Sequence, residues 1–525
     1  MNQELLQKKR EVIDFFLKKN ILLSDDILQQ DLELNFYDQL KKKIDSNDFL
    51  ILNSDLKNML DKVNKLELNW FELERGRVLL EKKKDNKIYS KFMEYFILEK
   101  KEKEDKKKKK VEEIFSYKDK KKKKKEIKHF ISYFNVRFDS IEKLLKNRQE
   151  LQNLTSINKI INKKDRETIS VIAMVSEKQI TKNKSILLTL EDKTGTIKAL
   201  INKNQTAYDE AKDIVLDEII GFTGTNNNDI IFVSNIIFPE VPLKEFKKSS
   251  DESYVIFLSD LHVGSKYFLS ENFNKFLKWI NQEIGTEKQK EIAKKVEYIF
   301  IIGDLVDGVG IYPEQDSELE IKDIYQQYNE CAKFLKKIPE RIPLIICPGN
   351  HDANRISEPQ IALYKDFSKP LYELNNVIMV SNPAYINIHS SENFPGFDVL
   401  IYHGYSFDYY VANVDSIRAK GGYDRADLIM KFLLKRRHLA PTYASTLYIP
   451  DNEKDPLVID KIPDFFCTGH IHNRPLASNY RSITMLSCGC WQSKTKFQER
   501  VGHNPDPCKI PIVNLSTREV KILKF

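Results

Sequence analysis

The sequence predicts a multidomain α/β protein: a helical N-terminal module, then a small all-β barrel, then a large layered α/β domain. From residue 251 onward, short apolar runs alternate with helical stretches such as FNKFLKWINQEI and RADLIMKFLLKRR, which is typical of layered α/β domains. Between residues 165 and 240, strand-like runs are separated by turn signals instead. A chain of 525 residues also exceeds one ordinary hydrophobic core, so several domains are expected.

The first 70 residues predict a helical module. The stretch VIDFFLKKNILL has apolar residues at three- and four-residue steps, and Ser24, Asp25 and Asp26 offer an N-cap for a second short helix. Residues 71–150 are rich in lysine and other charged side chains, which predicts a linker that is partly helical and partly disordered.

Two lysine runs lie within this linker, at 106–110 and 120–125. They fit a solvated connection between domains, and they fit equally well a polybasic tether that follows nucleic-acid phosphates without reading sequence. The net charge of the chain is +8 and is unevenly distributed, which favours a polyanionic partner. The sequence does not assign individual nucleic-acid-binding residues.

Residues 160–245 predict a small β-barrel. The runs ISVIAMVSEKQ, SILLTLEDKTGTIKALIN and EIIGFTGTNNNDIIFVSNIIF read as strands joined by tight turns. The phrase LTLEDKTGTIKALI resembles two consecutive strands of an OB-fold, a barrel that binds single-stranded nucleic acid or docks proteins. Because few aromatic residues are present for base stacking, docking is the favoured role of this barrel.

Polar residues with metal-binding side chains follow the apolar strands of the region 250–525. They are Asp260, His262, Asp304, Asp307, Asn350, His351, Asp352, His403, His470 and His472. A further run, TMLSCGCWQ, has the same shape but contains no obvious ligand. In layered α/β domains the loops at the carboxyl ends of strands form the ligand site. Five of the nine histidines in the chain lie in these motifs, which packing alone does not explain.

These residue types indicate a centre for two divalent metal ions that acts on phosphodiesters. Two cations about 4 Å apart can polarise a phosphoryl oxygen and activate a hydroxide, and they need one carboxylate between them. Asp304 is the expected bridge. Asp260 and His262 with one downstream histidine would hold the first ion, and Asn350 and His403 with the other downstream histidine would hold the second. The set includes an amide and no thiolate, which favours manganese, with magnesium or iron as alternatives, over structural zinc.

Three further residues have predicted roles around this centre. His351 is free to face the substrate, where an imidazole can protonate the leaving oxygen or stabilise charge on the phosphate. Asp352 is expected to orient His351, and Asp307 is expected to support a ligand or to cap the following turn.

The remaining composition predicts a protein of the cytoplasm. The six cysteines all lie at or beyond Cys331 without CxxC spacing, which is typical of buried thiols in a reducing compartment. No run of eighteen apolar residues and no charged-then-apolar leader occurs, so no membrane association is expected.

With these residues in view, the second half resembles the calcineurin-like metallophosphoesterase superfamily. The motifs DLH at 260–262, GDLVD at 303–307, GNHD at 349–352, YHG at 402–404 and GHIH at 469–472 occur in the order of that superfamily. The resemblance implies a layered β-sandwich flanked by helices. It implies one metal on Asp260, His262, Asp304 and His472, a second on Asp304, Asn350, His403 and His470, and His351 as the catalytic histidine.

A closer resemblance is to the small subunits of archaeal family D DNA polymerases. It rests on GNHDANR, YHGYSF, LLKRRHLAPTY, DPLVIDKIPDFFCTGHIH and WQSKTKFQ, and it extends over roughly residues 130–525. The resemblance implies a 3′–5′ proofreading exonuclease that binds DNA and a large catalytic polymerase subunit. A sliding clamp is a further candidate partner.

Two other functions compete with this hypothesis. The chain could be a non-catalytic scaffold of the polymerase, or a standalone nuclease or phosphatase of the same superfamily. The complete ligand set argues against a pure scaffold. The upstream barrel and the stretches KRRHLAP and WQSKTKFQ argue against a general phosphatase.

Overall fold

The computed structural model describes residues 13–14, 21–23, 50–52, 111–119, 124–163, 166–227, 229–500 and 502–525. The chain divides into two compact units, Met1–Lys108 and Lys109–Phe525. In the first unit, β1 (Ile21–Leu23) and β2 (Leu50–Leu52) pair in parallel. Most of the predicted helical module, the lysine run 106–110 and Lys120 to Lys123 lie outside the described residues.

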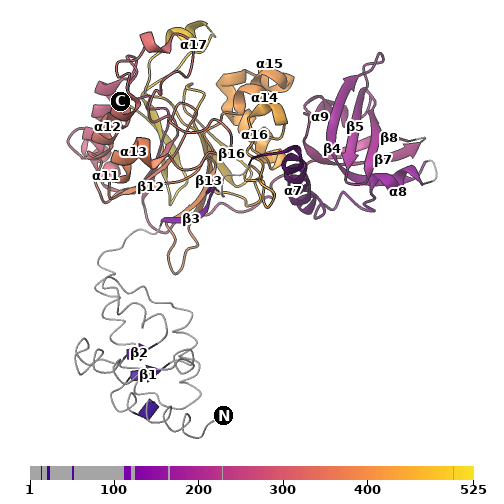
Figure 1. Ribbon diagram of the computed structural model, residues 1–525, viewed down its shortest axis with the longest axis horizontal. Helices are drawn as coiled ribbons and strands as arrows, with labels where there is room; N and C mark the ends of the chain where they lie inside the picture. Colours follow the sequence, from indigo (N-terminus) through magenta and orange to yellow (C-terminus); the bar gives the residue numbers. More distant parts are fainter. Residues whose placement is uncertain are drawn as a thin grey trace. The chain divides into compact units, whose positions relative to one another are not determined.

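The predicted barrel is confirmed as a closed barrel of five strands in the order β4-β5-β6-β8-β7 (Figure 1). Its strands are β4 (Thr168–Ile180), β5 (Ile186–Asp192), β6 (Gly195–Ile201), β7 (Ile219–Asn227) and β8 (Ile230–Ile237). Parallel pairing of β6 with β8 closes the barrel, and aliphatic side chains fill its interior. The turn before Gly195 is held by Asp192, whose Oδ1 accepts hydrogen bonds from the backbone of Thr194 and Gly195.

The larger domain contains two six-stranded sheets. The first, in the order β12-β11-β10-β9-β18-β19, consists of β9 (Tyr254–Leu258), β10 (Val296–Ile302), β11 (Leu344–Cys347), β12 (Val377–Met379), β18 (Lys509–Asn514) and β19 (Val520–Lys524). The second, in the order β16-β17-β15-β14-β13-β3, consists of β3 (Val111–Ser116), β13 (Ala384–Ile388), β14 (Phe397–Ile401), β15 (Phe465–Thr468), β16 (Leu476–Tyr480) and β17 (Ile483–Ser487).

The two sheets pack face to face over a buried apolar layer that includes Phe257 and Phe300 from the first sheet and Phe465 from the second. Strands β9 to β12 are parallel, as are β14, β15 and β17. Because both faces of these strands are covered, they read as continuous apolar runs rather than as alternating ones.

Helices cover the outer face of each sheet (Figure 1). The first sheet is covered by α10 (Ser270–Ile280), α11 (Glu287–Lys294), α12 (Ile324–Leu335) and α13 (Lys365–Tyr372). The second is covered by α14 (Phe407–Asn413), α15 (Asp415–Ala419) and α16 (Ala426–Arg436). The domain is therefore a four-layered α/β structure. Short helical segments occur in its loops: η1 (Gln315–Ser317), η2 (Gly422–Arg425), η3 (Tyr443–Ser445) and α17 (Lys496–Arg500).

The segment expected to be a charged linker differs in part from that expectation. Strand β3 pairs with β13 at the edge of the second sheet, and α7 (Ile127–Leu145) buries Tyr133 and Phe138. The lysine-rich surroundings hide these elements in the sequence, because the apolar residues of β3 find a partner only in β13, far along the chain. A short helix, α8 (Ile157–Ile161), follows α7 and packs on β6.

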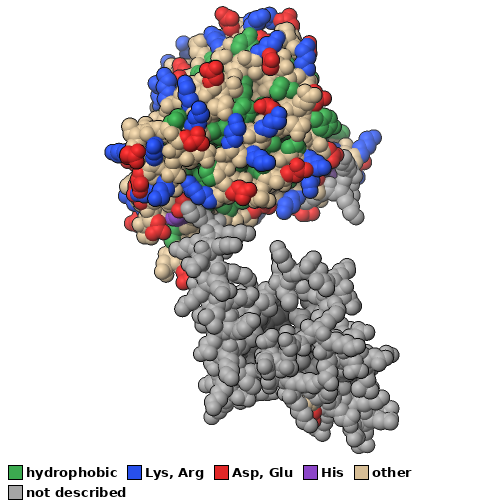
Figure 2. Space-filling view, turned by 90° about the vertical axis from the view of Figure 1, so that its left-hand side faces the viewer, with side chains coloured by type: hydrophobic (Ala, Val, Ile, Leu, Met, Phe, Trp, Pro, Cys, Tyr) green, Lys and Arg blue, Asp and Glu red, His purple; other side chains and the backbone are tan. Residues whose placement is uncertain are grey.

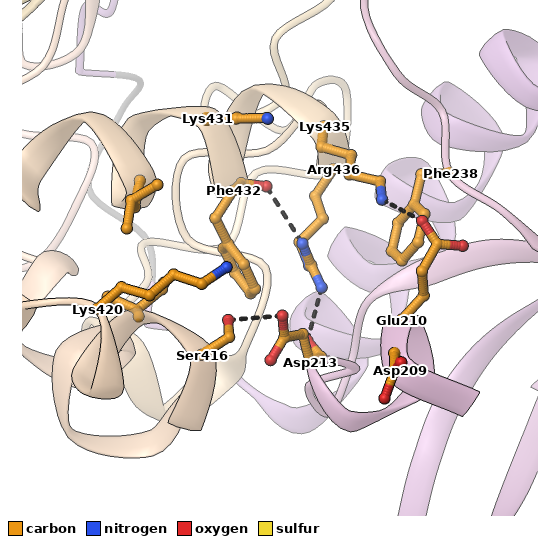
Figure 3. A pocket seen from close by; sticks show the side chains of 12 residues that line it. Asp209, Glu210, Asp213, Phe238, Ser416, Lys420, Lys431, Phe432, Lys435 and Arg436 are labelled. Carbon is orange, nitrogen blue, oxygen red and sulfur yellow. Dashed lines mark hydrogen bonds and ion pairs between the residues drawn. The ribbon is translucent and has the colours of Figure 1, made fainter. Parts of the chain in front are cut away.

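Helix α16 joins the barrel to the four-layered domain (Figure 3). Arg436 is buried, its Nε lies 2.5 Å from Glu218 Oε2, and its Nη2 donates to the Asp213 carbonyl at 2.6 Å. Lys435 pairs with Glu210 of α9 (Tyr208–Lys212), and Ser416 donates to the carboxylate of Asp213. Glu210, Asp213, Ser416, Lys435 and Arg436 are among the residues that line a pocket of about 320 Å³.

The described surface is mixed in charge, and the cysteines are buried. On the face shown in Figure 2, basic and acidic side chains are interspersed over the described residues.

All six cysteines are buried and free, as expected. Within the described part of the chain, no helix has the length and apolar character needed to cross a membrane.

Candidate metal centre

The predicted ligand residues all lie in loops that follow the carboxyl ends of parallel strands. Asp260 and His262 follow β9, Asp304 follows β10, and Asn350 follows β11 in the first sheet. His403 follows β14, while His470 and His472 follow β15 in the second sheet. Since the two sheets face each other, these loops meet at one edge of the sandwich.

The first half of the centre consists of Asp260, His262, Asp304 and His472, whose ligand atoms all lie within 4.8 Å of one another. The Nε2 atoms of His262 and His472 are 2.9 Å apart, and Nε2 of His472 is 3.2 Å from Asp260 Oδ1. All four side chains are buried. The structure therefore brings together the four residues that the resemblance assigns to one metal.

The second half consists of Asn350, His403 and His470, next to Asp304. Asn350 Oδ1 lies 2.9 Å from His403 Nε2 and 3.0 Å from His470 Nδ1. Asp304 Oδ2 is 3.3 Å from His403 Nε2 and 3.8 Å from His262 Nε2. One oxygen of Asp304 thus faces both halves, as a bridging carboxylate must.

In His403 and His470, the ring nitrogen that points away from Asn350 forms a hydrogen bond. This bond determines whether the other ring nitrogen can bind a cation. His403 Nδ1 donates to the Ile302 carbonyl at 2.9 Å, and His470 Nε2 donates to Asp408 Oδ2 at 3.1 Å. The nitrogens on the other side of the two rings, His403 Nε2 and His470 Nδ1, face Asn350 Oδ1, which can only accept. Lone pairs that face one another across about 3 Å repel unless a cation or a proton lies between them. This donor set fits a divalent cation.

In the first half of the centre, the ring of His262 is also held by a hydrogen bond from the nitrogen that points away from the other ligand residues. Asp307 Oδ1 accepts from His262 Nδ1 at 3.1 Å and from Gln492 Nε2 at 2.8 Å, and Gln315 Nε2 donates to Asp307 Oδ2 at 3.0 Å. Asp307 therefore contacts His262, one of the predicted ligand residues, as its first expected role requires. The motif TMLSCGCWQ, in which the sequence shows no obvious ligand, contributes Gln492 to this support.

Backbone geometry indicates that the ligands are held under local strain. Asp260, His262, Asp304, His470 and His472 all have a positive φ, between 52° and 71°. Non-glycine residues rarely occupy this left-handed region, although aspartate, asparagine and histidine tolerate it best. Such strain is typical of functional sites, where the surrounding structure over-determines the backbone.

The electrostatics of the centre follow from its burial. Burial alone would raise the pKa of the Asp304 carboxyl, but the imidazole rings of His403, His351 and His262 outweigh this and hold that pKa well below its usual range. Burial alone would lower the pKa of His403, but the carboxylate of Asp304 raises it to about 10. Protons on the imidazoles thus compensate the buried carboxylates where a cation would otherwise do so.

His351 lies beside Asp304 but is held differently from the ligand residues. Its Nδ1–H donates to the Asp307 carbonyl at 2.8 Å, and its backbone N–H donates to Asp304 Oδ1 at 2.8 Å. Its ring lies edge-on to that of His262, with centroids 4.6 Å apart. Burial lowers the pKa of His351. The hydrogen bond to the carbonyl places the proton on Nδ1 and leaves Nε2 as the atom that can exchange one.

The expectation that Asp352 orients the imidazole of His351 needs correction, because the carbonyl of Asp307 does so. The carboxylate of Asp352 accepts from the backbone N–H groups of Leu305 and Gly349 and from the hydroxyl of Tyr328. Its burial, followed by the charge of Asp304, raises its pKa to about 7. Asp352 thus ties together the two loops that carry Asp304 and Asn350.

Besides Gln315 and Gln492, two residues that contact the imidazole rings directly were not predicted from the sequence. Gln498 Nε2 lies 2.8 Å from His472 Nδ1, and Asp408 contacts His470. Gln498 forms a capping box with Thr495, so a Thr-x-x-Gln pattern in the stretch WQSKTKFQ was the available signal. Asp408 follows YHG by four residues, but its contact with His470 depends on tertiary structure.

Comparison with known proteins gives matches to components of DNA polymerases. Residues 255–476 match a family described as the B subunits of DNA polymerases alpha and epsilon. Over 401 residues the chain is 38% identical to the DNA polymerase II small subunit of Methanothermobacter thermautotrophicus, covering 76% of this chain and 80% of that protein.

Further relatives have the same name. The chain is 36% identical over 403 residues to the DNA polymerase II small subunit of Pyrococcus furiosus, covering 76% of this chain and 64% of that protein. It is 40% identical over 395 residues to the DNA polymerase II small subunit of Methanocaldococcus jannaschii, covering 74% of this chain and 64% of that protein. The match thus spans slightly less than two thirds of these two relatives. Among solved structures, an asparaginyl-tRNA synthetase from Pyrococcus horikoshii aligns with 16% of this chain and 22% of its own at 14% identity, and its TM-score of 0.15 supports no structural argument.

Proposed function

The chain belongs to the family of archaeal family D DNA polymerase small subunits, and from this premise we propose that it is a 3′–5′ proofreading exonuclease that docks a large catalytic polymerase subunit. The observation that carries the proposal is the convergence of six oxygen and nitrogen ligand residues around Asp304. A subunit that acted only as a scaffold would have no need for buried and strained residues whose ligand atoms converge on one carboxylate.

The residues fit two divalent cations. Asp260, His262, Asp304 and His472 would hold one, while Asp304, Asn350, His403 and His470 would hold the other. When bound, such cations polarise a phosphodiester and lower the pKa of water enough to supply hydroxide near neutral pH. Oxygen and imidazole ligands without a thiolate favour manganese, with magnesium or iron as alternatives.

The chain's own residues have separate tasks in hydrolysis of the terminal phosphodiester. Asp307, Gln498 and Asp408 fix the rings of His262, His472 and His470. In His351, Nδ1 is bonded to the Asp307 carbonyl, so Nε2 is the nitrogen that remains for the substrate. In this position it can stabilise charge on the phosphate or give a proton to the 3′ oxygen that leaves.

Docking of the large subunit is supported by an exposed apolar surface at the start of α7. Ile127 is 80% exposed and Ile131 is 59% exposed. Phe130 of the same helix lies against Tyr443 of η3, and Ile127, Phe130 and Ile131 line one hollow of the surface. Exposed apolar groups that gather in this way are typical of protein–protein contacts. DNA as substrate and a sliding clamp as an additional partner are parts of the same proposal.

Replacing Asp304 with alanine tests the proposal. We expect the variant to lose release of nucleotides from a 3′ end, because both halves of the centre lose their shared oxygen. Co-elution with the large subunit should remain, since Asp304 is buried away from the surface of α7. Nucleotide release at the wild-type rate would show that the assigned site is wrong.

The competing proposal, a scaffold subunit without activity, predicts a different outcome. Neither the wild-type chain nor the variant would release nucleotides, even with the large subunit and manganese present, and both would still bind the partner.

A further inference from the structure

An exposed aromatic ring lies at the edge of the metal centre. Phe497 of α17 is 41% exposed, although phenylalanine is usually buried. One side of its ring stacks on Tyr312, with centroids 5.1 Å apart and planes inclined by 28°. The ring of Tyr312 in turn lies 6.2 Å from that of His351. The two rings therefore extend from the predicted catalytic histidine towards solvent.

This pair of rings is held in place from the side of Tyr312. The hydroxyl of Tyr312 donates to Glu318 Oε2 at 2.9 Å, and the backbone N–H of Lys496 donates to Glu318 Oε1 at 3.2 Å. The carboxylate of Glu318 thus binds both Tyr312, on which Phe497 stacks, and Lys496, which precedes Phe497 in the chain. The exposed ring has a defined position relative to His351.

The segment that carries Phe497 is also tied to the metal centre. Gln498, the next residue, contacts His472, and Arg500 pairs with Glu314 at 2.8 Å across to the loop of Tyr312. Lys494 and Lys496 are exposed on the same segment. The surroundings of Phe497 thus combine a flat apolar surface with positive charge, a combination suited to single-stranded nucleic acid.

We propose that Phe497, backed by Tyr312, is the surface on which the terminal base of an unpaired 3′ end stacks while its phosphodiester lies at the metal centre. The proposal rests on the exonuclease function proposed above. Proofreading needs a contact that holds any base once it has left the duplex, and stacking on an aromatic ring is tolerant of sequence because every base has a π-face.

The first test compares two single-stranded oligonucleotides, one with a normal 3′-terminal nucleotide and one with an abasic 3′ terminus. With the full chain and its large subunit, we expect Phe497→Ala to raise KM for the normal strand about tenfold, because one base stack is lost. KM for the abasic strand should change little. Phe497→Trp should restore the wild-type preference. Equal KM values for wild type and Phe497→Ala on the normal strand would overturn the proposal.

Two controls separate stacking from a merely structural role. Phe246 is 39% exposed and lies before β9, at the opposite end of the strands from the site. Phe246→Ala should leave both KM values unchanged. Turnover of methyl 4-nitrophenyl phosphate, which has no base, should be unaffected by Phe497→Ala. A fall in kcat on this small diester would show that Phe497 acts by positioning Gln498, and it would contradict the proposal.

A binding measurement keeps the test independent of catalysis. An oligonucleotide with 2-aminopurine at its 3′ end and a phosphorothioate at the last linkage should lose fluorescence on binding to the wild-type chain, because the base stacks. Phe497→Ala should abolish this quenching, and Phe246→Ala should retain it. Equal quenching in all three would overturn the proposal. Absence of nucleotide release by the wild type, with quenching that depends on Phe497, would instead count against the exonuclease function alone.

Discussion

Asp304 and His403 illustrate how single residues determine the chemistry of the centre. The carboxylate of Asp304 raises the pKa of His403 to about 10, although burial alone would lower it. His403 is therefore protonated at neutral pH when no cation is present. An imidazole must lose its proton before its nitrogen can bind a metal.

This coupling predicts a pH dependence of metal affinity. A cation competes with the proton on His403, so affinity should rise with pH throughout the range below the pKa of about 10. We expect Mn²⁺ affinity to increase at least about tenfold per pH unit between pH 6 and 8, measured by titration calorimetry in buffers of different ionisation enthalpy. His403→Asn should reduce both the affinity and its slope. An affinity that does not change with pH would contradict this account of the centre.

Gly349 shows why glycine precedes ligands in these motifs. A Cβ at this position would lie 2.2 Å from Asp304 Oδ1 and 2.5 Å from the Asp304 backbone nitrogen. Gly469 has the same constraint, because a Cβ there would lie 2.7 Å from Asp260 Oδ2. The carboxylates can reach their positions only because these residues lack a side chain.

Gly349→Ala should therefore weaken metal binding. Displacement of the shared carboxylate should lower Mn²⁺ affinity by about 10- to 100-fold, as loss of supporting groups does in other metal sites. Gly195→Ala is the matched control, since its Cβ would meet nothing closer than 3.7 Å. Calorimetric titration of both variants distinguishes them, and equal affinities would show that the backbone contact is not limiting.

Helix α7 is the element whose packing differs most from its appearance in the sequence. Arg137 is buried, and its Nε donates to Asp455 Oδ2 at 2.6 Å. The guanidinium also lies 4.8 Å from the ring centroids of Phe134 and Tyr448. A buried arginine in a charged stretch cannot be recognised without its partner, which lies 318 residues further along the chain.

Arg137→Met should destabilise the larger unit by about 3–5 kcal/mol, because it leaves Asp455 buried without its cation. The exposed pair Lys146–Glu142 provides the control, and Lys146→Met should cost less than about 1 kcal/mol. Urea denaturation at pH 7 measures both changes. Similar values for the two variants would mean that α7 is not held by this ion pair.

The Arg137–Asp455 ion pair also makes the free energy of unfolding depend on pH in the acid range. Burial would raise the pKa of Asp455, but Arg137 and His438 outweigh it and hold that pKa below its usual range. The contribution is therefore fully present above the unfolded pKa of about 4 and is lost as the pH falls towards the lower folded value.

At the scale of the whole molecule, the layered α/β domain and the barrel could be predicted from the spacing of apolar residues and the length of apolar runs, because both are properties of short stretches of sequence. Strands buried on both faces read as apolar runs, and strands of the barrel are separated by turn residues. The convergence of the candidate ligand residues could be predicted for a related reason, since each follows such a strand and parallel strands end at one edge of the sheet.

Other parts of the site could not be predicted because they depend on contacts between distant loops. Gln498 and Phe497 lie in α17, Asp408 lies in α14 and Tyr312 lies in a loop, and these segments are too short for a periodic pattern to indicate which side chains meet. The misplaced role of Asp352 has the same origin. Its neighbour in sequence is His351, but its carboxylate points back to the backbone of the loop that carries Asp304.

The proposed exonuclease function rests on the centre around Asp304 and His351, which would remove nucleotides from mispaired 3′ ends. The most direct test is manganese-dependent digestion of a primer–template with a 3′ mismatch by the full chain with its large subunit, comparing wild type with His351→Ala. We predict stepwise release of single nucleotides from the 3′ end by the wild type and loss of that release in the variant. Equal release by both proteins, or no release by either, would contradict the account.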